Sequence, residues 1–289
     1  MDASKRIERS LERALSFANG PGRPEKLGAA LRYAVFPGGA RVRPRLCLAV
    51  AGACGKPQPG AADAAASAIE LLHCASLVHD DMPCFDNADL RRGKPSVHVT
   101  FDEPIALLAG DALIVLAFET IARECATEPH LIGPLIATIG RAVGMPHGIV
   151  AGQAWESEDE IPLDLYHRAK TASLFTGAVA AGAIAAGADP QPWLRVGSAL
   201  GAAYQAADDL RDVAASAEEI GKPCDQDKTN RRPNAVASLG LSGCLSHLRG
   251  LVEDAVDAIP PCPGSGALTD LIRGEAKRLV PKELAQHAA

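Results

Sequence analysis

Aromatic side chains are scarce in this sequence of 289 residues, of which only 4% are Phe, Trp or Tyr. Hydrophobic residues still make up 47% and charged residues 22% of the chain, a composition typical of globular proteins. The core must therefore consist mainly of small aliphatic side chains. No linker or tandem repeat divides the sequence, so we predict a single domain covering residues 1–289.

Signatures of several other protein classes are missing. The formal net charge is −6 and no long basic stripe occurs, which argues against nucleic acid as the main partner. The eight cysteines form no CxxC pair and have no zinc-like His spacing, so we expect free thiols in a reducing cytoplasm. No secretory signal and no run of about 20 strongly apolar residues stands out. We therefore expect no transmembrane segment and interpret residues 172–188, rich in Ala and Gly, as a buried helix.

Motifs for nucleophilic or nucleotide chemistry are also absent. The sequence contains no GxSxG, no P-loop and no Gly-rich dinucleotide fingerprint after a strand. The chemistry must therefore come from other polar residues, and two clusters of aspartates are the main candidates.

Helical periodicity recurs along almost the whole chain, and no alternating strand pattern stands out. We predict an all-α protein. The expected helices cover about residues 1–17, 25–35, 43–54, 61–81, 104–124, 131–143, 148–156, 163–186, 193–217, 236–258 and 267–286. Residues 83–100 and 221–234 are expected to be long polar loops, which in compact domains are usually functional or disordered.

The first acidic cluster follows an apolar helix pattern. Asp80 and Asp81 lie at the predicted C-terminal end of the helix, where exposed carbonyl groups also favour a bound cation. Pro83 ends the helix, so Asp86 can fold back from the loop toward Asp80. Mg²⁺ binds in proteins through one or two carboxylates together with substrate phosphates and water. A solvated acidic helix end is the alternative interpretation, and this cluster alone does not decide between the two.

The second acidic cluster has a sharper spacing. Asp208 and Asp212 lie four residues apart on one helix face, with Asp209 adjacent and Gln205 one turn before. Like charges at this spacing destabilise a bare helix, so the pair calls for a counter-ion. Arg211 can supply part of that charge, which leaves a salt-bridged helix face as the alternative. Two such clusters, each at the end of an apolar stretch, favour a metal site together.

Several cations are candidates for binding a diphosphate group. Arg binds phosphate with two parallel hydrogen bonds and Lys binds it as a point charge. Any single basic residue is more often a surface side chain. The candidates are Arg41, Arg43, Arg91, Arg92 and Lys170 with its neighbour Thr171. His73 lies two helical turns before Asp80 on much the same face, and a satisfied core histidine is its alternative interpretation.

These residues belong to motifs that occur in order across nearly the whole chain. The motifs are FPGGARVRP, LLHCASLVHDDMPCFDNADLRRGKPSVH, GDALIVLAFE, AKTASLF, YQAADDLRDV and GKPCDQD. Together they resemble the trans-isoprenyl diphosphate synthases, and most of all the geranylgeranyl diphosphate synthases of bacteria that make carotenoids and chlorophylls. The combination is specific, because a DDxxxxD…RR block with a distant DDxxD is seldom found elsewhere.

The resemblance implies a role for each matching position. It implies a catalytic set of Asp80, Asp81, Asp86, Lys170, Asp208, Asp209 and Asp212, in which Asp80, Asp86, Asp208 and Asp212 hold three Mg²⁺ ions. It assigns Arg91, Lys170, Thr171 and Gln205 to the allylic diphosphate, and Arg43, His73 and Arg92 to isopentenyl diphosphate. The implied fold is a bundle of antiparallel helices around a deep central cavity, usually as a homodimer.

The implied reaction needs no protein nucleophile. Metal ions and cationic side chains draw the diphosphate off a dimethylallyl, geranyl or farnesyl substrate, which leaves an allylic carbocation. The double bond of isopentenyl diphosphate attacks this cation, and the released diphosphate removes the proton. A dry cavity with small aliphatic walls would protect the cation from water.

Product length can be argued from the residues that precede the first acidic cluster. Ala75 and Ser76 lie five and four residues before Asp80, roughly 6–7.5 Å below it along a helix. Relatives that make the C15 product farnesyl diphosphate usually carry an aromatic residue there. Small residues leave room for a further isoprene unit, so we predict the C20 product geranylgeranyl diphosphate.

The sequence departs from the family pattern at two positions, and rival functions stay open. Ala40 stands where the family usually has Lys, although Arg41 or Arg43 can compensate, and Arg232 replaces a late Lys. The alternatives are a farnesyl diphosphate synthase and a non-catalytic subunit that modulates an active synthase. A class I terpene cyclase fits less well, because aromatics are scarce and the second motif is rich in Asp.

Overall fold

The computed structural model describes residues 2–36, 38–55, 58–214 and 235–279. This part of the chain is helical apart from one short hairpin, which confirms the all-α prediction. Its α-helices are α1 (Ala3–Ala18), α2 (Glu25–Val35), α3 (Val42–Ala53), α4 (Pro59–Asp80), α5 (Val97–Thr100), α6 (Glu103–Glu124), α7 (Pro129–Val143), α8 (Ile149–Ala154), α9 (Leu163–His167), α10 (Ser173–Ala185), α11 (Leu194–Ala214), α14 (Ala235–Asp257) and α15 (Ser265–Leu279). The short elements are β1 (Leu90–Arg91), β2 (Lys94–Pro95), the 3₁₀ turns η1 (Trp155–Ser157) and η3 (Gln191–Trp193), and the π-helical segment η2 (Arg168–Ala172).

The helices agree with the expected ones to within a few residues, but two regions differ. The expected loop over residues 83–100 contains the antiparallel β1–β2 hairpin and the short helix α5. The expected helix over residues 163–186 consists of α9, η2 and α10, since one π-helical turn interrupts the regular hydrogen bonding. The expected loop over residues 221–234 and the last parts of two expected helices, residues 215–217 and 280–286, lie outside the described part of the chain.

Helix α10 lies at the centre of the bundle and is almost entirely buried, as expected for residues 172–188. It packs against α3, α4, α7 and α11. Small residues permit this close packing. A Cβ atom at Gly177, for example, would lie 2.6 Å from the Cβ atom of Ala142 on α7. The small residues of α10 therefore allow its neighbouring helices to pack closely against it.

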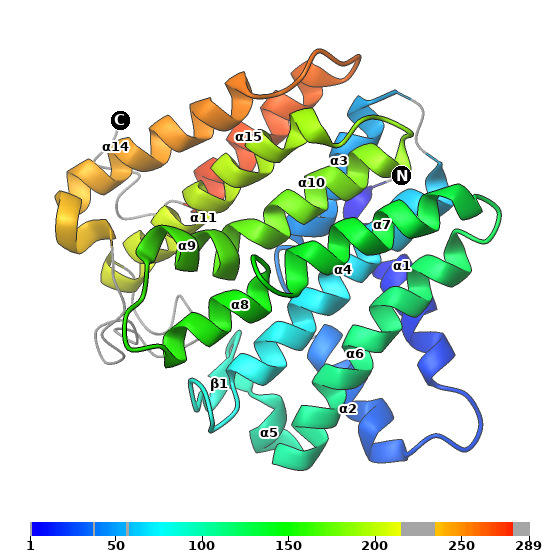
Figure 1. Ribbon diagram of the computed structural model, residues 1–289. Helices are drawn as coiled ribbons and strands as arrows, with labels where there is room; N and C mark the ends of the chain where they lie inside the picture. Colours follow the sequence, from blue (N-terminus) through cyan, green and yellow to red (C-terminus); the bar gives the residue numbers. More distant parts are fainter. Residues whose placement is uncertain (1, 37, 56–57, 215–234, 280–289) are drawn as a thin grey trace.

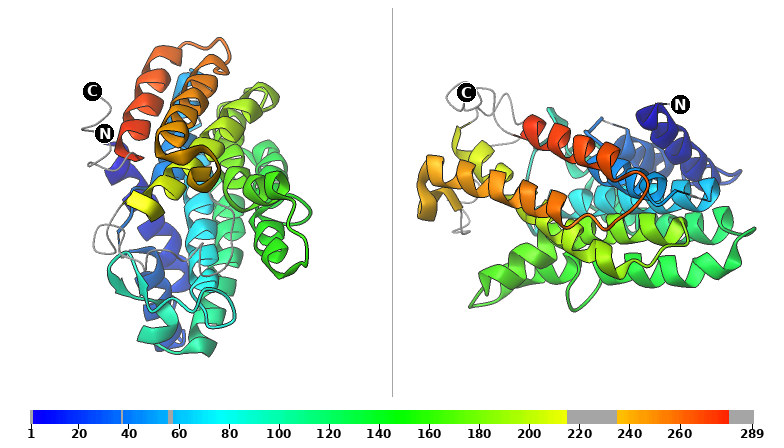
Figure 2. Two further views of the ribbon diagram at one scale, coloured as in Figure 1. Left: turned by 90° about the vertical axis from the view of Figure 1, so that its left-hand side faces the viewer. Right: turned by 90° about the horizontal axis from the view of Figure 1, so that it is seen from above.

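The bundle contains two apolar clusters. One is formed mainly by α1, α2, α4, α6 and α7, and the other mainly by α3, α10, α11, α14 and α15. Figure 1 shows α4, α7, α10 and α11 running side by side along the molecule, with α14 and α15 together at one side. The view from above in Figure 2 shows α15, α3 and α1 on the opposite side of the bundle from α7 and α8.

Both acidic helix ends lie at the same end of the bundle. The C-terminal ends of α4 and α11 lie near the β1–β2 hairpin and the short helices α8 and α9, at the left of Figure 1. Helix ends expose carbonyl groups and short loops expose side chains. This end of the bundle can therefore expose the polar side chains of a binding site, while the rest of α4 and α11 packs against other helices.

Three helices of the described chain are long and apolar enough to cross a membrane by length and composition alone. They are α4, α6 and α14. The most apolar window is 78% buried inside the molecule in α4, 44% in α6 and 17% in α14. The apolar surface of α4 is thus used for packing in the bundle, and the absence of a transmembrane segment stays a prediction.

Candidate active site

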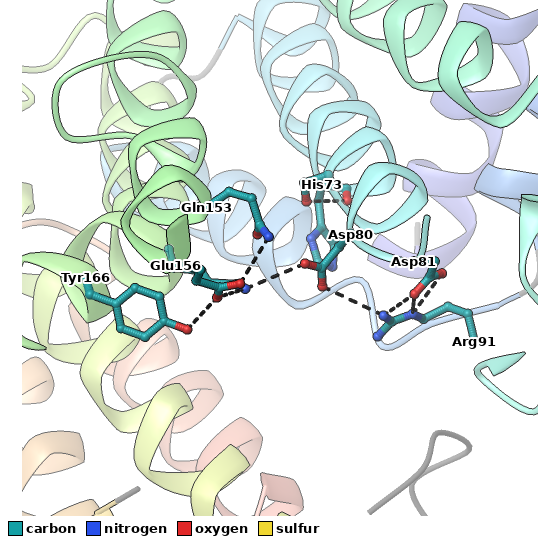
Figure 3. A network of polar contacts seen from close by, with 9 residues as sticks. His73, Asp80, Asp81, Arg91, Gln153, Glu156 and Tyr166 are labelled. Carbon is teal, nitrogen blue, oxygen red and sulfur yellow. Dashed lines mark hydrogen bonds and ion pairs between the residues drawn. The ribbon is translucent and has the colours of Figure 1, made fainter. Parts of the chain in front are cut away.

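The two neighbouring aspartates at the end of α4 point into different surroundings. Asp81 is only 2% exposed and accepts hydrogen bonds from the guanidinium of Arg91 on β1, at 2.9 and 3.2 Å from Nε. Asp80 is less enclosed, yet its Oδ1 atom is buried and has no hydrogen-bond partner. Figure 3 shows Asp81 facing Arg91 and Asp80 facing the opposite wall of the site. Asp81 therefore holds Arg91 in place, and Asp80 offers an open carboxylate.

The loop after α4 returns toward the helix end. The backbone N–H of Asp86 donates to the carbonyl oxygen of Asp80 at 2.9 Å, and that of Asn87 donates to Met82 at 3.0 Å. The third carboxylate of the motif is thereby brought next to the first. Burial raises the pKa of Asp80, and the negative charge of Asp86 adds to this shift. A site that opposes ionisation in this way favours a bound cation.

Two cationic side chains flank Asp80. The Nζ atom of Lys170, on η2, lies 3.6 Å from Asp80 Oδ1, and Arg91 Nη2 lies 3.9 Å from Asp80 Oδ2. Lys170 also forms an ion pair with Glu156 on η1. Residues predicted to hold the metal and the allylic diphosphate thus meet at one place, although they come from α4, β1 and η2.

The residues predicted to bind isopentenyl diphosphate form a second cationic group. Arg43 Nη1 lies 3.3 Å from His73 Nε2, and Arg92 Nη1 donates to the carbonyl oxygen of Gly38. The Arg43 guanidinium also stacks over the Phe175 ring, 4.5 Å from its centroid, while its Nε atom is buried without a hydrogen-bond partner. This group is positively charged and poised for an anion.

The protonation of these residues follows from their burial. Burial, reinforced by the positive charge of Arg43, lowers the pKa of the His73 imidazole well below its usual value. A neutral His73 can accept a hydrogen bond from Arg43. Burial also lowers the pKa of Arg43, whereas Tyr204, Glu70 and Asp208 oppose this shift. Asp208 belongs to the second acidic cluster, so Arg43 lies within electrostatic range of that cluster.

Arg41, which we considered as a ligand for diphosphate beside Arg43, does not face the site. Its side chain points into the bundle, is 5% exposed, and donates to Glu8 at 2.8 Å, to Glu70 at 2.7 Å and to the carbonyl oxygen of Val35 at 2.7 Å. A buried guanidinium must be paired in this way, because leaving it unpaired is very costly. Arg41 therefore anchors the turn before α3, and only Arg43 faces the site.

The second acidic cluster, on α11, divides its roles in a similar way. Asp209 is 1% exposed and accepts hydrogen bonds from Gln205 Nε2 at 2.9 Å and from the backbone N–H of Ala235 at 2.7 Å. Thr171 donates to Gln205 Oε1 at 2.7 Å, which connects η2 to α11. Asp208 is more open and pairs with Arg211 at 2.9 Å. Asp212 lies one turn further along α11, and its side chain lies outside the described residues.

The two predicted chain-length residues differ in their surroundings. Ser76 is half-buried and shares a face of α4 with His73 and Asp80, since these residues lie three, four and seven positions apart. Ala75 is 1% exposed and belongs to the apolar core. Ser76 is therefore the one of the two that lies on the side of α4 that faces the site.

Sequence reasoning missed a polar group on the opposite wall. Glu156 accepts hydrogen bonds from Tyr166 Oη at 2.7 Å and from Gln153 Nε2 at 3.2 Å, in addition to its pair with Lys170 (Figure 3). Glu156 begins an acidic stretch that looks like a solvated surface segment. No spacing rule connects it to Lys170, which lies fourteen residues later. Gln153 three residues before it is the one signal of a second polar residue on the same face.

The first cluster fits a magnesium ion. Among the residues that the structure describes, no three His, Cys, Asp or Glu side chains converge into a complete metal site. Mg²⁺ does not need one, because it commonly takes one or two carboxylates and completes its shell with substrate phosphates and water. Asp80 has an unpartnered buried oxygen, and Asp86 lies close enough to act on it electrostatically. Asp80 and Asp86 are therefore the residues that would hold the ion here.

A cavity of about 660 Å³ in the described part of the chain lies beside this site rather than in it. It is lined by α9, η2, α11 and α14, including His167, Arg195 and Asp254. It lies on the face of α11 that carries Gln205 and Asp209, while Asp208 is on another face. Gln205 and Asp209 are thus shared between this cavity and the site, but Asp80, Lys170 and Arg43 do not line it.

The sequence matches one family model and many characterised proteins. The model described as polyprenyl synthetase matches residues 24–257. The chain is 50% identical to the geranylgeranyl diphosphate synthase of Cereibacter sphaeroides over 285 residues, which cover 99% of both chains. It is 38% identical to the farnesyl diphosphate synthase of Geobacillus stearothermophilus over 260 residues, which cover 86% of both.

Solved structures show the same fold. The geranyltransferase of Helicobacter pylori, solved with magnesium and isoprenyl diphosphate, superposes with a TM-score of 0.78 at 30% identity, covering 96% of this chain and 98% of that one. A synthase from Zymomonas mobilis, described as an FPP/GFPP synthase, has a TM-score of 0.78 at 33% identity and covers 96% and 99%. The predicted isoprenoid synthase fold is thus confirmed.

Proposed function

This chain belongs to the polyprenyl synthetase family of prenyltransferases, and on that premise we propose that it is a geranylgeranyl diphosphate synthase. It would condense isopentenyl diphosphate with dimethylallyl, geranyl or farnesyl diphosphate and release the all-trans C20 product. The relatives at about half identity over their whole length carry that name. Farnesyl diphosphate synthase is the alternative, because a relative with that name is 38% identical.

One observation in the site supports this proposal more than any other. Asp80 has a buried carboxylate oxygen without a hydrogen bond, and Arg43 has a buried guanidinium N–H without one. Buried polar groups in native proteins are nearly always satisfied, so each exception calls for an explanation, and in a polar site a bound ligand is one. The orphan oxygen suits a metal cation, and the orphan N–H suits an anion. A metal–diphosphate complex and a second diphosphate would satisfy both.

The residues of the chain divide the work of the reaction. Lys170 and Arg91 would hold the allylic diphosphate beside Asp80 and stabilise the negative charge that develops as it leaves. Arg43 on α3, Arg92 after β1 and neutral His73 on α4, two helical turns before Asp80, would hold isopentenyl diphosphate. Thr171 and Gln205 connect η2 to α11, and Lys170 on the same segment connects η2 to Asp80 on α4, so η2 links the two acidic helices.

Magnesium is the metal we propose, with three ions per site when substrate is bound. Asp80 and Asp86 would hold ions from one side, and Asp208 and Asp212 from the other. When bound, the metal supplies positive charge that stabilises the departing diphosphate. The solved structure of the Helicobacter pylori geranyltransferase contains magnesium and isoprenyl diphosphate, which supports the assignment.

The C20 product follows from the wall of α4 below Asp80. Ser76 is small and half-buried on the same face as Asp80 and His73, so it leaves space for a growing chain. Ala75 is small as well, but it lies in the core and would act through the packing behind the wall. A C20 product of this kind is a precursor of carotenoids and of chlorophyll side chains, which we propose as its use.

We further propose a homodimer. Leu107, Leu108 and Val115 are exposed large apolar side chains on α6. These residues share one face of α6 with the exposed Asp111, and a second copy of the chain would cover this mainly apolar face. Light scattering of the purified protein tests this, and a mass of one chain at micromolar concentration would contradict it. A cytoplasmic location is consistent with seven free cysteines among the described residues.

The proposed function is tested with purified protein, isopentenyl diphosphate, farnesyl diphosphate and Mg²⁺. The protein alone should release a C20 diphosphate, and chelation of the metal or Asp208→Ala should abolish the product. A C15 product from geranyl diphosphate that is not extended would favour the farnesyl diphosphate alternative. Product formation only after addition of a second, active synthase would instead indicate a modulating subunit, the reading that the missing lysine at Ala40 leaves open.

A further inference from the structure

We propose that Glu156 is a positioning residue that holds the Lys170 ammonium off Asp80 and thereby keeps the Asp80 carboxylate open to a divalent cation. This inference rests on the proposed function, because it concerns the metal site of the first acidic cluster. It adds a residue that the motifs of the sequence do not include. Its basis is a competition between two carboxylates for one ammonium group.

The two carboxylates lie on either side of Lys170. The Nζ atom donates a hydrogen bond to Glu156 Oε1 and lies 3.6 Å from Asp80 Oδ1, which is buried and receives no hydrogen bond. The labelled side chains of Asp80 and Glu156 face each other across the site in Figure 3. A small shift of the Lys170 ammonium group from Glu156 toward Asp80 would therefore let it bond to the oxygen atom that a metal ion would need.

Glu156 is itself held in place. Tyr166, which is 6% exposed, donates its hydroxyl hydrogen to Glu156 Oε1, and Gln153 donates to Oε2. With Lys170, three donors thus fix both carboxylate oxygens. Gly152 lets α8 approach η2 closely, because a Cβ atom at position 152 would collide with the backbone of Lys170. Helix α8 and η2 can therefore pack directly, and Glu156 comes within reach of Lys170.

The consequence of losing Glu156 follows from the same geometry. A neutral side chain at this position would no longer attract the ammonium, and Asp80 is the carboxylate that remains beside it. The Asp80–Lys170 ion pair, which is now 3.6 Å long and has no hydrogen bond, would then shorten and compete more strongly with a metal ion for Asp80. Partners that orient a metal ligand without touching the metal typically alter metal affinity 10- to 100-fold when they are removed.

Binding of Mn²⁺ to the full-length protein without substrate, measured by electron paramagnetic resonance, tests the proposal independently of catalysis. The site of the first cluster is identified as the one that disappears in Asp80→Asn. We expect Glu156→Gln to weaken this site about tenfold. Tyr166→Phe, which leaves the charge but loosens Glu156, should weaken it two- to threefold. Glu158→Gln removes an exposed carboxylate two residues away and is the matched control, with no expected change.

A double-mutant cycle separates positioning from a simple change of charge. If Glu156 acts through Lys170, then Glu156→Gln should have little effect in a Lys170→Met background, and the double variant should bind Mn²⁺ within about twofold of Lys170→Met alone. A tenfold loss that persists in that background would overturn the proposal, because Glu156 would then act directly on the metal. Unchanged binding in Glu156→Gln, with Tyr166→Phe also unchanged, would overturn it too.

Failure of the proposed function looks different in this experiment. A wild-type protein with no Asp80-dependent Mn²⁺ site and no prenyl product would overturn both the metal assignment and this inference. Wild-type binding that depends on Asp80 but is indifferent to Glu156 would overturn this inference alone. If Glu156→Gln does not fold, the same cycle can be measured with Tyr166→Phe in place of Glu156→Gln. Tyr166→Phe should then weaken Mn²⁺ binding in the wild-type background but not in the Lys170→Met background.

Discussion

Both acidic clusters begin with two adjacent aspartates and contain a third one further along the chain, yet their surroundings differ. In both, the second aspartate turns inward, where Asp81 holds Arg91 and Asp209 holds Gln205 and the first residue of α14. The first aspartate stays toward the site. The Asp80 side chain is 18% exposed and has a buried oxygen without a hydrogen bond, 3.6 Å from Lys170, whereas the Asp208 side chain is 41% exposed and is hydrogen-bonded to Arg211.

The first cluster therefore has its cationic partners already in place, whereas the surroundings of the second cluster are more exposed. Around Asp80, the cations Lys170 and Arg91 come from two other elements and are fixed by carboxylates of their own. Around Asp208, the pairing cation comes from the next turn of the same helix, which is a weak, solvent-screened contact. We therefore expect the first cluster to bind the diphosphate before reaction and the second to complete the metal site when substrate arrives.

Removal of either outward aspartate should give the largest effect. We expect Asp80→Asn and Asp208→Asn each to lower kcat about 10³-fold, since each removes charge that stabilises the departing diphosphate. Asp80→Asn should also abolish binding of the allylic substrate, whereas Asp208→Asn should leave that binding within a few fold. Steady-state kinetics with substrate binding by calorimetry measures both. Equal losses of binding in the two variants would break the comparison.

The inward aspartates should affect stability instead. Asp81→Ala removes the hydrogen-bonded partner of the partly buried Arg91 guanidinium, which keeps only the 3.9 Å ion pair with Asp80, and we expect it to lower the free energy of unfolding by about 3 kcal/mol. Asp209→Ala removes one hydrogen bond within α11 and one to the first residue of α14, and should cost about 2 kcal/mol. Urea denaturation measures these values. Wild-type stability in both variants would mean that the inward aspartates serve the substrate rather than the fold.

Product length should respond to changes on α4 and not on α11. Ser76→Phe places an aromatic ring on the face that carries Asp80, and we expect C15 to become the main product. Ala75→Phe should act in the same direction but also destabilise the protein, because Ala75 lies in a packed core. Chromatography of dephosphorylated products gives the C15 to C20 ratio. A folded Ser76→Phe variant that still makes mainly C20 would remove Ser76 from the wall.

Replacing Ala40 by the lysine that is usual in the family should add a positive charge to the group predicted to bind isopentenyl diphosphate. Ala40 is exposed next to the Gly38–Gly39 turn, which Arg92 contacts, so a lysine fits there without displacing a neighbour. We expect Ala40→Lys to lower the KM for isopentenyl diphosphate a few fold and to leave the KM for the allylic substrate unchanged. An unchanged or higher KM for isopentenyl diphosphate would show that this position plays no part in binding.

The smallest effect is expected at the more exposed second cluster. Arg211→Met removes an exposed ion pair with Asp208, which should change the free energy of unfolding by less than about 1 kcal/mol. Mg²⁺ should then saturate the enzyme at a slightly lower concentration, because Asp208 no longer has a competing cation. Thermal unfolding and the Mg²⁺ dependence of the rate measure these two values. A loss of several kcal/mol would show that Arg211 has a structural role like that of Arg91.

Much of the site was predictable because its residues occur in spaced motifs on helices. The i, i+4 spacing of Asp208 and Asp212 and the sequence Asp80–Pro83–Asp86 carry their geometry in the chain itself. Arg41 and Arg43 show the limit of this reasoning. Two arginines two residues apart look equivalent in the sequence, but a helix start directs one into the core, where Glu8 and Glu70 pair with it, and the other into the site.

The sequence by itself determined the all-α class, the helix ends and the two acidic clusters, because helical periodicity, prolines and carboxylate spacing act over a few residues. Only the tertiary structure decided which aspartate of each pair faces the site. It also decided that Glu156 meets Lys170 and that Ser76 rather than Ala75 shares a face with Asp80. These outcomes depend on which helices pack together, and a contact between α4, η1 and η2 is set by the burial of whole helix faces rather than by any local pattern.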